Sequence, residues 1–261
     1  MKRSIKHLLG RAAFASPVGH LLLANPAVIV AFHRVQDSWD PNGLTIGRDL
    51  FDRYCRFFAQ HFHVVALRDL IAKLERGEDV SRHLAITFDD GYRDNVENAA
   101  PTLEHHSLPA TFFVTSGWVG SDVVPWWDEM HGLRHPWMTW DQVRSLRRAG
   151  FDIGAHTRTH VDLGKTTEQD ARHEILGARL ELEDRLAIPV DLFAFPYGRP
   201  ENCADTTRAL VKASGFRCCC SCFGGVNRPG QSPYDLVRVP ISPWYATPYQ
   251  FGFETALGRT V

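Results

Sequence analysis

The segment ITFDDGYRDN, residues Ile86 to Asn95, places two adjacent carboxylates directly after a short hydrophobic run. The apolar residues that precede Asp89 and Asp90 are typical of a buried strand in a parallel sheet. Two carboxylates this close repel each other, and each raises the free-energy cost of ionising the other. A cation or a proton between them would offset that cost. The segment therefore indicates a functional site at the end of a strand.

The rest of the chain repeats the alternation of strand and helix. Apolar runs predict strands at 27–32, 63–66, 84–88, 111–115, 151–154, 191–195, 216–220 and 236–239. Apolar spacing and capping residues predict helices at 48–60, 67–76, 95–106, 139–148, 167–186 and 205–214, with Pro101 interrupting the third. The pattern favours an α/β fold, a distorted (β/α) barrel of about seven to eight mostly parallel strands. The shortness of several strands argues against a closed, regular barrel.

Functional side chains of such folds gather just beyond the C-terminal ends of the strands. We therefore expect the residues at those ends to share one rim: His33, Asp89, Asp90, His156, His160, Pro196 and Tyr197.

Composition and charge bound the class of protein. The chain has 261 residues, of which 44% are hydrophobic and 23% charged, as in ordinary globular enzymes. A net charge of −1 gives no electrostatic footprint for nucleic acid, so none is expected as a partner. We expect a basic amphipathic segment at 1–25 and one catalytic domain at 26–261.

The first 25 residues begin with Lys2, Arg3 and Lys6, as a signal peptide does. Arg11 and His20 interrupt the apolar part, so no signal sequence is predicted. One face of a helix could instead contact a membrane surface; the alternative is a plain surface helix. The residues of that face are Ile5, Leu8, Leu9, Ala12 and Ala13.

Six cysteines are present, and four of them fall within residues 218–222. Neighbouring cysteines on a strand point to alternate faces, and this run lacks the C-x-x-C spacing of a zinc site. The interpretation we favour is a reduced chain, cytoplasmic or associated with the inner membrane.

A second polar motif, HTRTH at 156–160, directly follows the predicted strand at 151–154. Two histidines four residues apart can bind one metal ion, and Asp90 would complete a set of two histidines and one carboxylate. Such a set leaves coordination positions open, as a hydrolytic metal centre needs. Asp89 then stays free to accept a proton from water at the ion. The alternative is that both aspartates only cap the next helix.

Three motifs in this order, TFDDG at 87–91, HTRTH at 156–160 and FPYG at 195–198, resemble the polysaccharide deacetylases. This is also called the NodB-homology or carbohydrate esterase 4 family. The flanking VIVAFHRV at 28–35 and GGVNRPGQSPYDLVRV at 224–239 are similar to its poly-N-acetylglucosamine deacetylase branch. The resemblance implies a distorted barrel and a divalent metal held by Asp90, His156 and His160, zinc first, with cobalt or nickel as alternatives.

The implied reaction is hydrolysis of N-acetyl groups from an amino-sugar glycan, as in exopolysaccharide biosynthesis. The resemblance makes Asp89 the catalytic base, and the backbone amide of Tyr197 a stabiliser of the oxyanion.

The sequence departs from the family pattern at two positions. Many members carry an arginine just before the third motif, where this chain has FAF at 193–195. Arg238 is the candidate to orient Asp89 instead; a purely structural arginine is the alternative. Members also place a histidine near the C-terminus, which this chain lacks. His33 is the substitute we favour as the acid that protonates the leaving amine, rather than a histidine that only hydrogen-bonds at a strand end.

A tryptophan-rich segment at 123–140 supplies candidates for sugar binding. Trp126 and Trp127 are predicted to stack on sugar rings, although most tryptophans are simply packed in a core. Pro196 of the third motif is grouped with them as a substrate-binding residue.

Three functional hypotheses remain. The first is a metal-dependent deacetylase of an acetylated amino-sugar glycan. The second is the same centre acting on another ester or non-peptide amide. The third is a glycan-binding pseudoenzyme, which the missing arginine favours and the retained Asp89 disfavours, because a binding module has no use for a free base.

Overall fold

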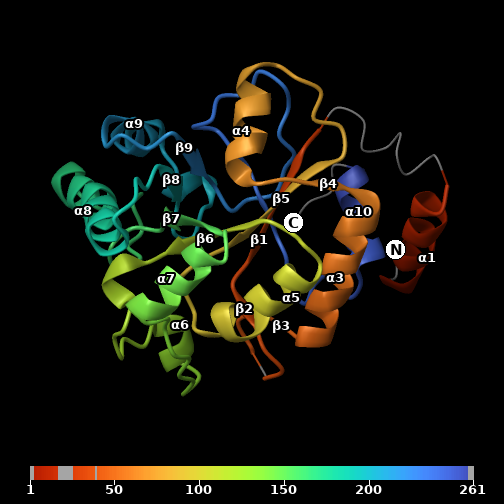
Figure 1. Ribbon diagram of the computed structural model, residues 1–261, viewed down its shortest axis with the longest axis horizontal. Coiled ribbons are helices and arrows are strands. Elements are labelled where there is room, and N and C mark those ends of the chain that lie inside the picture. The colour runs from red at the N-terminus through yellow and green to blue at the C-terminus, as the bar shows by residue number, and fades with distance from the viewer. Residues whose placement is uncertain (1–2, 17–25, 39, 258–261) are drawn as a thin grey trace.

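The computed structural model describes residues 3–16, 26–38 and 40–257, and Figure 1 shows its ribbon. Parallel strands in the order β10-β1-β5-β6-β7-β8-β9 form the main sheet, and β4 pairs with the start of β5 on the side away from β1. These strands are β1 (Val28–Phe32), β4 (His63–Val64), β5 (His83–Phe88), β6 (Ala110–Val114), β7 (Asp152–Ala155), β8 (Leu192–Ala194), β9 (Cys218–Cys220) and β10 (Val239–Pro240). A second, two-stranded sheet consists of β2 (Arg34–Val35) and β3 (Thr45–Ile46). The predicted distorted barrel is confirmed.

The ring of strands closes through a narrow link between β9 and β10. Cys220 forms a single parallel bridge with Leu236, and only Val239 and Pro240 pair with β1. The strand predicted at 236–239 is therefore mostly a connection that touches both edges of the sheet. β9 and β10 do not pair with each other, so the barrel is irregular, as its short strands indicated.

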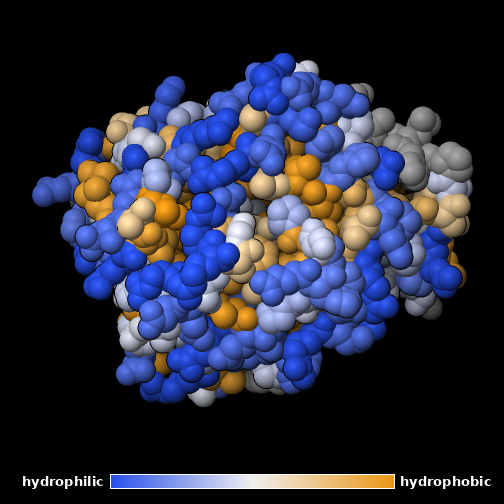
Figure 2. Space-filling view, viewed as in Figure 1, coloured by the Kyte–Doolittle hydropathy of each residue, from blue (hydrophilic) through white to orange (hydrophobic). Residues whose placement is uncertain are grey.

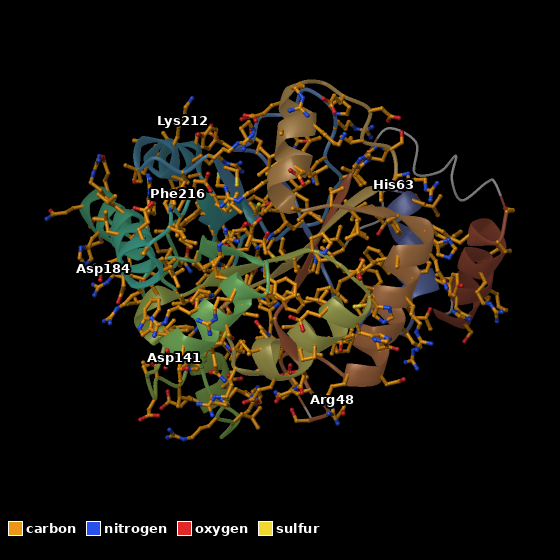
Figure 3. All side chains as sticks on the ribbon, in the orientation of Figure 1. Arg48, His63, Asp141, Asp184, Lys212 and Phe216 are labelled. Carbon is orange, nitrogen blue, oxygen red and sulfur yellow. The ribbon has the colours of Figure 1, made fainter. Side chains whose placement is uncertain are left out.

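Helices surround the sheet, and charged side chains such as Arg48, Asp184 and Lys212 lie on their outer surfaces (Figures 1 and 3). Thr139 caps α7 in a capping box with Gln142. The helices are α1 (Arg3–Phe14), α3 (Arg48–His61), α4 (Leu67–Glu75), α5 (Ala100–His105), α6 (Trp126–Glu129), α7 (Trp140–Arg148), α8 (Glu168–Leu186), α9 (Asp205–Ala213) and α10 (Pro248–Ala256).

The helix predicted at 95–106 is divided where proline intervenes. A π-helical turn at Asn95–Ala99 precedes α5, in which Pro101 occupies one of the first two positions. Proline has no N–H to donate and its ring crowds the carbonyl four residues earlier, so a wider turn before it accommodates the ring.

The core lies on both sides of the strands. Val30 and Phe32 of β1 belong to a large cluster with the aromatic side chains of α3, whereas Ile29 joins a second cluster with α4. The cysteine run shows the same alternation, with Cys219 in the first cluster and Cys218 in the second. All six cysteines lie among the described residues and are free thiols. The outer surface is largely hydrophilic, with hydrophobic patches between (Figure 2).

Strand register aligns the predicted functional residues. Phe32 of β1 pairs with Phe88 of β5, and Val114 of β6 pairs with Ala155 of β7. Parallel strands aligned in this way end at the same level, so the residues that follow them meet above the same end of the barrel.

Candidate active site

A cavity of about 850 Å³ opens at the C-terminal ends of the strands. Eight of the predicted residues line it: His33, Asp89, Asp90, Trp126, Trp127, His156, His160 and Tyr197. Arg238 lies behind this lining, against Asp89. Pro196 is buried and does not line the cavity. The turn directs its neighbour Tyr197 toward the opening instead, and a role of Pro196 in substrate binding stays a prediction.

Asp89 and Asp90 point to different partners, which explains how two adjacent carboxylates coexist. Both are 2% exposed. Asp89 accepts two hydrogen bonds from Arg238, at 2.7 Å from Nη1 and 2.8 Å from Nη2. Burial raises the pKa of the Asp89 carboxyl, but the charge and hydrogen bonds of Arg238, together with the nearby imidazoles, outweigh burial and lower that pKa below its usual value. Asp89 is therefore an oriented, ionised carboxylate.

Arg238 is itself held inside the barrel. Its Nε donates to the Ser221 carbonyl at 2.7 Å, and its Nη1 donates to Thr87 Oγ1 at 3.0 Å. The guanidinium is fully buried and lies over the Phe113 ring. Four directed contacts fix the plane of the fork and therefore the orientation of the Asp89 carboxylate.

Asp90, His156 and His160 form a compact group. One potential ligand atom from each lies within 4.8 Å of the others, and all three residues are buried. Asp90 Oδ1 is 3.3 Å from His156 Nε2 and 3.2 Å from His160 Nε2.

The chemistry of this group fits a divalent ion. His156 Nδ1 lies 2.9 Å from the Ala194 carbonyl, which only accepts, so Nδ1 carries the proton and Nε2 presents a lone pair toward Asp90. The buried Asp90 Oδ1 has no hydrogen-bond partner among the described residues. Lone pairs that face each other without a proton between them are unfavourable, and a cation among them removes that cost.

The HTRTH loop is held by a residue that the sequence did not single out. Glu174 of α8 accepts the backbone N–H groups of Arg158 and Thr159 at 2.9 and 2.8 Å, and the Thr159 hydroxyl at 2.7 Å. The side chain is nearly buried, at 8% exposure. Glu174 is the one acidic residue among the buried residues of α8. To recognise it from the sequence, one would have to know which face of α8 packs on the barrel.

The backbone of the site is strained. The φ angles are 73° at Asp90, 60° at Thr157, 57° at His160 and 60° at Tyr197. Non-glycine residues seldom adopt this left-handed region, and those that do gather at functional sites.

Tyr197 and Gly198 form the turn of the third motif. Gly198 has a φ of +62°, and a Cβ atom there would lie 2.3 Å from the Cys222 nitrogen, so only glycine fits. The Tyr197 N–H has no hydrogen-bond partner among the described residues. Its phenol ring meets His160 edge-on at 4.9 Å. An unpaired amide at the cavity edge is what the predicted oxyanion contact requires.

His33 directly follows β1 and is half-buried at the cavity. Its carbonyl accepts a hydrogen bond from Asn95 Nδ2 at 2.7 Å, which fixes the backbone at the end of β1. The imidazole lines the cavity with Asp89 and Asp90. The structure thus places this residue on the same rim as the histidine pair, as the sequence predicted.

The two predicted tryptophans differ in exposure. Trp126 is 58% exposed and donates from Nε1 to the Tyr197 hydroxyl at 3.3 Å. Trp127 is 8% exposed, donates to the Tyr92 hydroxyl and packs edge-on against His160 at 4.9 Å. Trp126 therefore offers an accessible ring at the cavity mouth, whereas Trp127 forms part of the cavity wall beside His160.

A buried ion pair anchors the short helix that carries these tryptophans. Arg34 Nη1 donates to both carboxylate oxygens of Asp128 in α6 at 2.9 Å, and the two side chains are fully buried. Asp40 lies 3.1 Å from the same guanidinium, and Tyr92 stacks beneath it. This network is not predicted from the sequence, because its members are too far apart in the chain to form a local motif.

Further polar residues line the outer part of the cavity and were also missed. They are Asn42, Asp162, Lys165, Arg199, Glu201 and Asn202. Asn42 reaches α6 by donating to the Trp127 carbonyl at 2.9 Å.

Residues 76–219 match the family model described as polysaccharide deacetylase. The chain therefore belongs to the polysaccharide deacetylase family, a family of hydrolases, as its motifs indicated. The Bacillus subtilis protein YxkH, which its name assigns provisionally to the same family, is 24% identical over 217 residues, covering 82% of this chain and 71% of YxkH.

Two further relatives extend the comparison. A Staphylococcus aureus poly-beta-1,6-N-acetyl-D-glucosamine N-deacetylase is 20% identical over 259 residues, covering 90% of this chain and 86% of that protein. The structure of IcaB from Ammonifex degensii has a TM-score of 0.73 and 22% identity, covering 88% of this chain and 97% of that one. The structural likeness supports the barrel fold.

Proposed function

We propose that the protein hydrolyses N-acetyl groups of an amino-sugar polysaccharide or its glycan precursor, using a divalent ion, zinc first, held by Asp90, His156 and His160. The observation that carries this proposal is the convergence of two differently built carboxylates at the floor of one cavity. Asp89 is paired with Arg238, and Asp90 faces the two histidines. In this proposal Asp89 is the base, and Asp90 with the two histidines is the cation site.

Each residue of the chain has a distinct task in this proposal. A divalent ion at the group supplies Lewis acidity, which polarises an amide carbonyl and favours ionisation of water. Asp89 accepts the proton of the attacking water at a carboxylate oxygen, and Arg238 keeps that oxygen aimed into the cavity. The Tyr197 N–H donates to the oxygen that becomes negatively charged on the acetyl carbon.

Departure of the sugar nitrogen needs a proton, because an amine is a poor leaving group without one. We assign the donation to the His33 imidazole. The C–N bond then breaks, the water oxygen remains on the acetyl group, and the products are acetate and a free amino sugar. Trp126 offers its exposed ring to the apolar face of a sugar at the cavity mouth.

The proposed role of Arg238 also weighs against the pseudoenzyme hypothesis. The missing arginine of the third motif was the observation that favoured a binding module. Arg238 makes a two-point contact with Asp89 from the link before β10, so Asp89 has an ionic partner although the motif arginine is missing.

The first test is metal content, measured on wild type and on His156→Ala/His160→Ala after incubation with zinc, cobalt or nickel. We expect about one ion per chain in wild type and its loss in the double variant. His173→Ala serves as the control, because this histidine lies on α8 outside the group. Absence of a bound ion in the wild type would contradict the proposed metal site.

The second test is acetate release from N-acetylglucosamine oligomers linked β-1,6, beside O-acetylated xylan at the same acetyl concentration. We expect release from the amino-sugar oligomers and its loss in Asp89→Asn. Release from xylan alone would favour the alternative in which the same centre hydrolyses esters. Unchanged release by Asp89→Asn would exclude this residue as the base.

A further inference from the structure

Helix α1 has two apolar faces, and only one of them packs on the protein. On the inner face Phe14 meets Phe57 edge-on at 5.0 Å, and Gly10 lies so close to α10 that a Cβ would be 2.1 Å from the Tyr249 carbonyl. Lys6 pairs with Glu254 at 2.9 Å. These contacts attach α1 firmly to α10, which lies beside it at the edge of the molecule (Figure 1).

The outer face of α1 carries a stripe of large apolar side chains that are about half exposed. Ile5, Leu8 and Leu9 are 47%, 63% and 43% exposed. Their spacing puts them on one side of the helix, where Ala12 continues the stripe one turn later. Figure 2 shows hydrophobic atoms at the edge of the molecule where α1 lies. Isolated exposed leucines are common, but three on one face of a single helix mark an interaction surface.

The charge of the region selects the kind of partner. The first acidic residue of the chain is Asp37, whereas basic residues begin at Lys2. Arg11 is exposed and forms no ion pair with any residue that the structure describes. A basic helix with an apolar stripe is complementary to an anionic lipid headgroup layer over an acyl interior.

The dimensions of the stripe favour a bilayer surface over a second copy of the chain. Stable protein interfaces bury about 800 Å² per partner, which three partly exposed side chains on a helix of 12 residues do not approach. An interfacial helix needs only such a stripe and flanking basic residues. Among the described residues, no helix is both long and apolar enough to traverse a bilayer.

We propose that α1 docks the protein peripherally on an anionic lipid surface, with Ile5, Leu8 and Leu9 entering the boundary between headgroups and acyl chains. Arg11 lies at the headgroups, and the inner face of α1 stays on α10. This inference is independent of the proposed function, since it uses no residue of the cavity.

The test is sedimentation of the full-length chain with vesicles of phosphatidylglycerol and phosphatidylcholine, compared with phosphatidylcholine alone. We expect binding to the anionic vesicles that weakens with added salt. Ile5→Ser/Leu8→Ser/Leu9→Ser should lower the partition coefficient by about tenfold or more. Leu180→Ser is the matched control, because Leu180 is 56% exposed on α8 and lies outside the stripe.

Folding of the triple variant is checked by its melting temperature and by acetate release from a soluble oligomer, both of which should equal those of the wild type. Failure of the wild type to sediment with anionic vesicles would overturn the proposal, as would equal sedimentation of the triple variant. A wild-type dimer in solution that the triple substitution dissociates would assign the stripe to a second copy instead.

Discussion

Asp89 and Arg238 are 149 residues apart in the chain and form a two-point ion pair at 2.7 and 2.8 Å inside the barrel. Arg238 lies in the link that closes the ring of strands, immediately before β10, and Asp89 follows β5. Closure of the barrel therefore brings the arginine to the base. The pairing depends on the topology of the sheet and not on a local motif.

Replacing Arg238 with methionine should abolish activity and lower the free energy of unfolding by about 3–5 kcal/mol. The reason is that the Asp89 carboxylate would remain buried without a compensating charge. Urea denaturation and acetate release measure the two effects. Asp89→Asn combined with Arg238→Met should recover part of the stability and none of the activity; equal stability of the single and double variants would contradict the pairing argument.

The Arg34–Asp128 pair should control substrate binding through α6. Asp128→Asn leaves Arg34 with only Asp40 as an ionic partner, and we expect a loss of about 2–4 kcal/mol of stability and a rise in KM larger than the fall in kcat. The control is Arg48→Met, which breaks the exposed Arg48–Asp37 pair and should change stability by less than about 1 kcal/mol. A fall in kcat with KM unchanged would argue against a role in positioning the tryptophans.

Gly198 should tolerate no side chain. Gly198→Ala combines a positive φ with a clash against the Cys222 backbone, so we expect loss of activity and a destabilisation of about 3 kcal/mol or more. Gly120 has a φ of +72° and open space around its Cβ position. Gly120→Ala should therefore cost about 1 kcal/mol from backbone strain alone, without loss of activity. If Gly198→Ala and Gly120→Ala changed the melting temperature and acetate release equally, the close approach of Gly198 to Cys222 would not determine stability or activity.

Asp94 should make the protein less stable as the pH rises from about 4 to about 6. Burial raises the pKa of its carboxyl to about 6, although hydrogen bonds from Val35 and Asn95 oppose that shift. In this window the folded state binds the proton and the unfolded state has released it, so increasing pH favours unfolding. Asp94→Asn should remove this pH dependence of the free energy of unfolding and stabilise the protein at pH 8 by about 1–3 kcal/mol. Urea denaturation at several pH values measures both effects. A steeper fall in the variant would contradict the direction of the shift.

The location of the site followed from the sequence because strand ends are marked by residue type. A buried apolar run that stops at Asp89, or just before His156, identifies both the strand and its functional end. Pairing in a parallel sheet then places such ends together without further information. The same reasoning does not distinguish Pro196, which is buried, from Tyr197, which lines the cavity, because it treats every residue of the turn alike.

The contacts that hold the site could not be derived in this way. Glu174 supports the HTRTH loop from the middle of a charged helix, where periodicity does not distinguish one glutamate from its neighbours. Arg34 and Asp128 are 94 residues apart, and each resembles an ordinary surface charge in its local segment. Long-range pairs of this kind depend on the packing of loops, which no local pattern encodes.

The narrow link between β9 and β10 affects the order in which the protein loses activity and unfolds on heating. One bridge at Leu236 and two paired residues of β10 hold this seam, and Arg238 lies within it. Segments with few backbone pairs open locally before the rest of a domain unfolds. Amide protons at 236–239 should accordingly exchange with deuterium earlier than those of β5 and β6. Heat would release the guanidinium from the base while the barrel stays folded, so inactivation should precede the loss of circular dichroism.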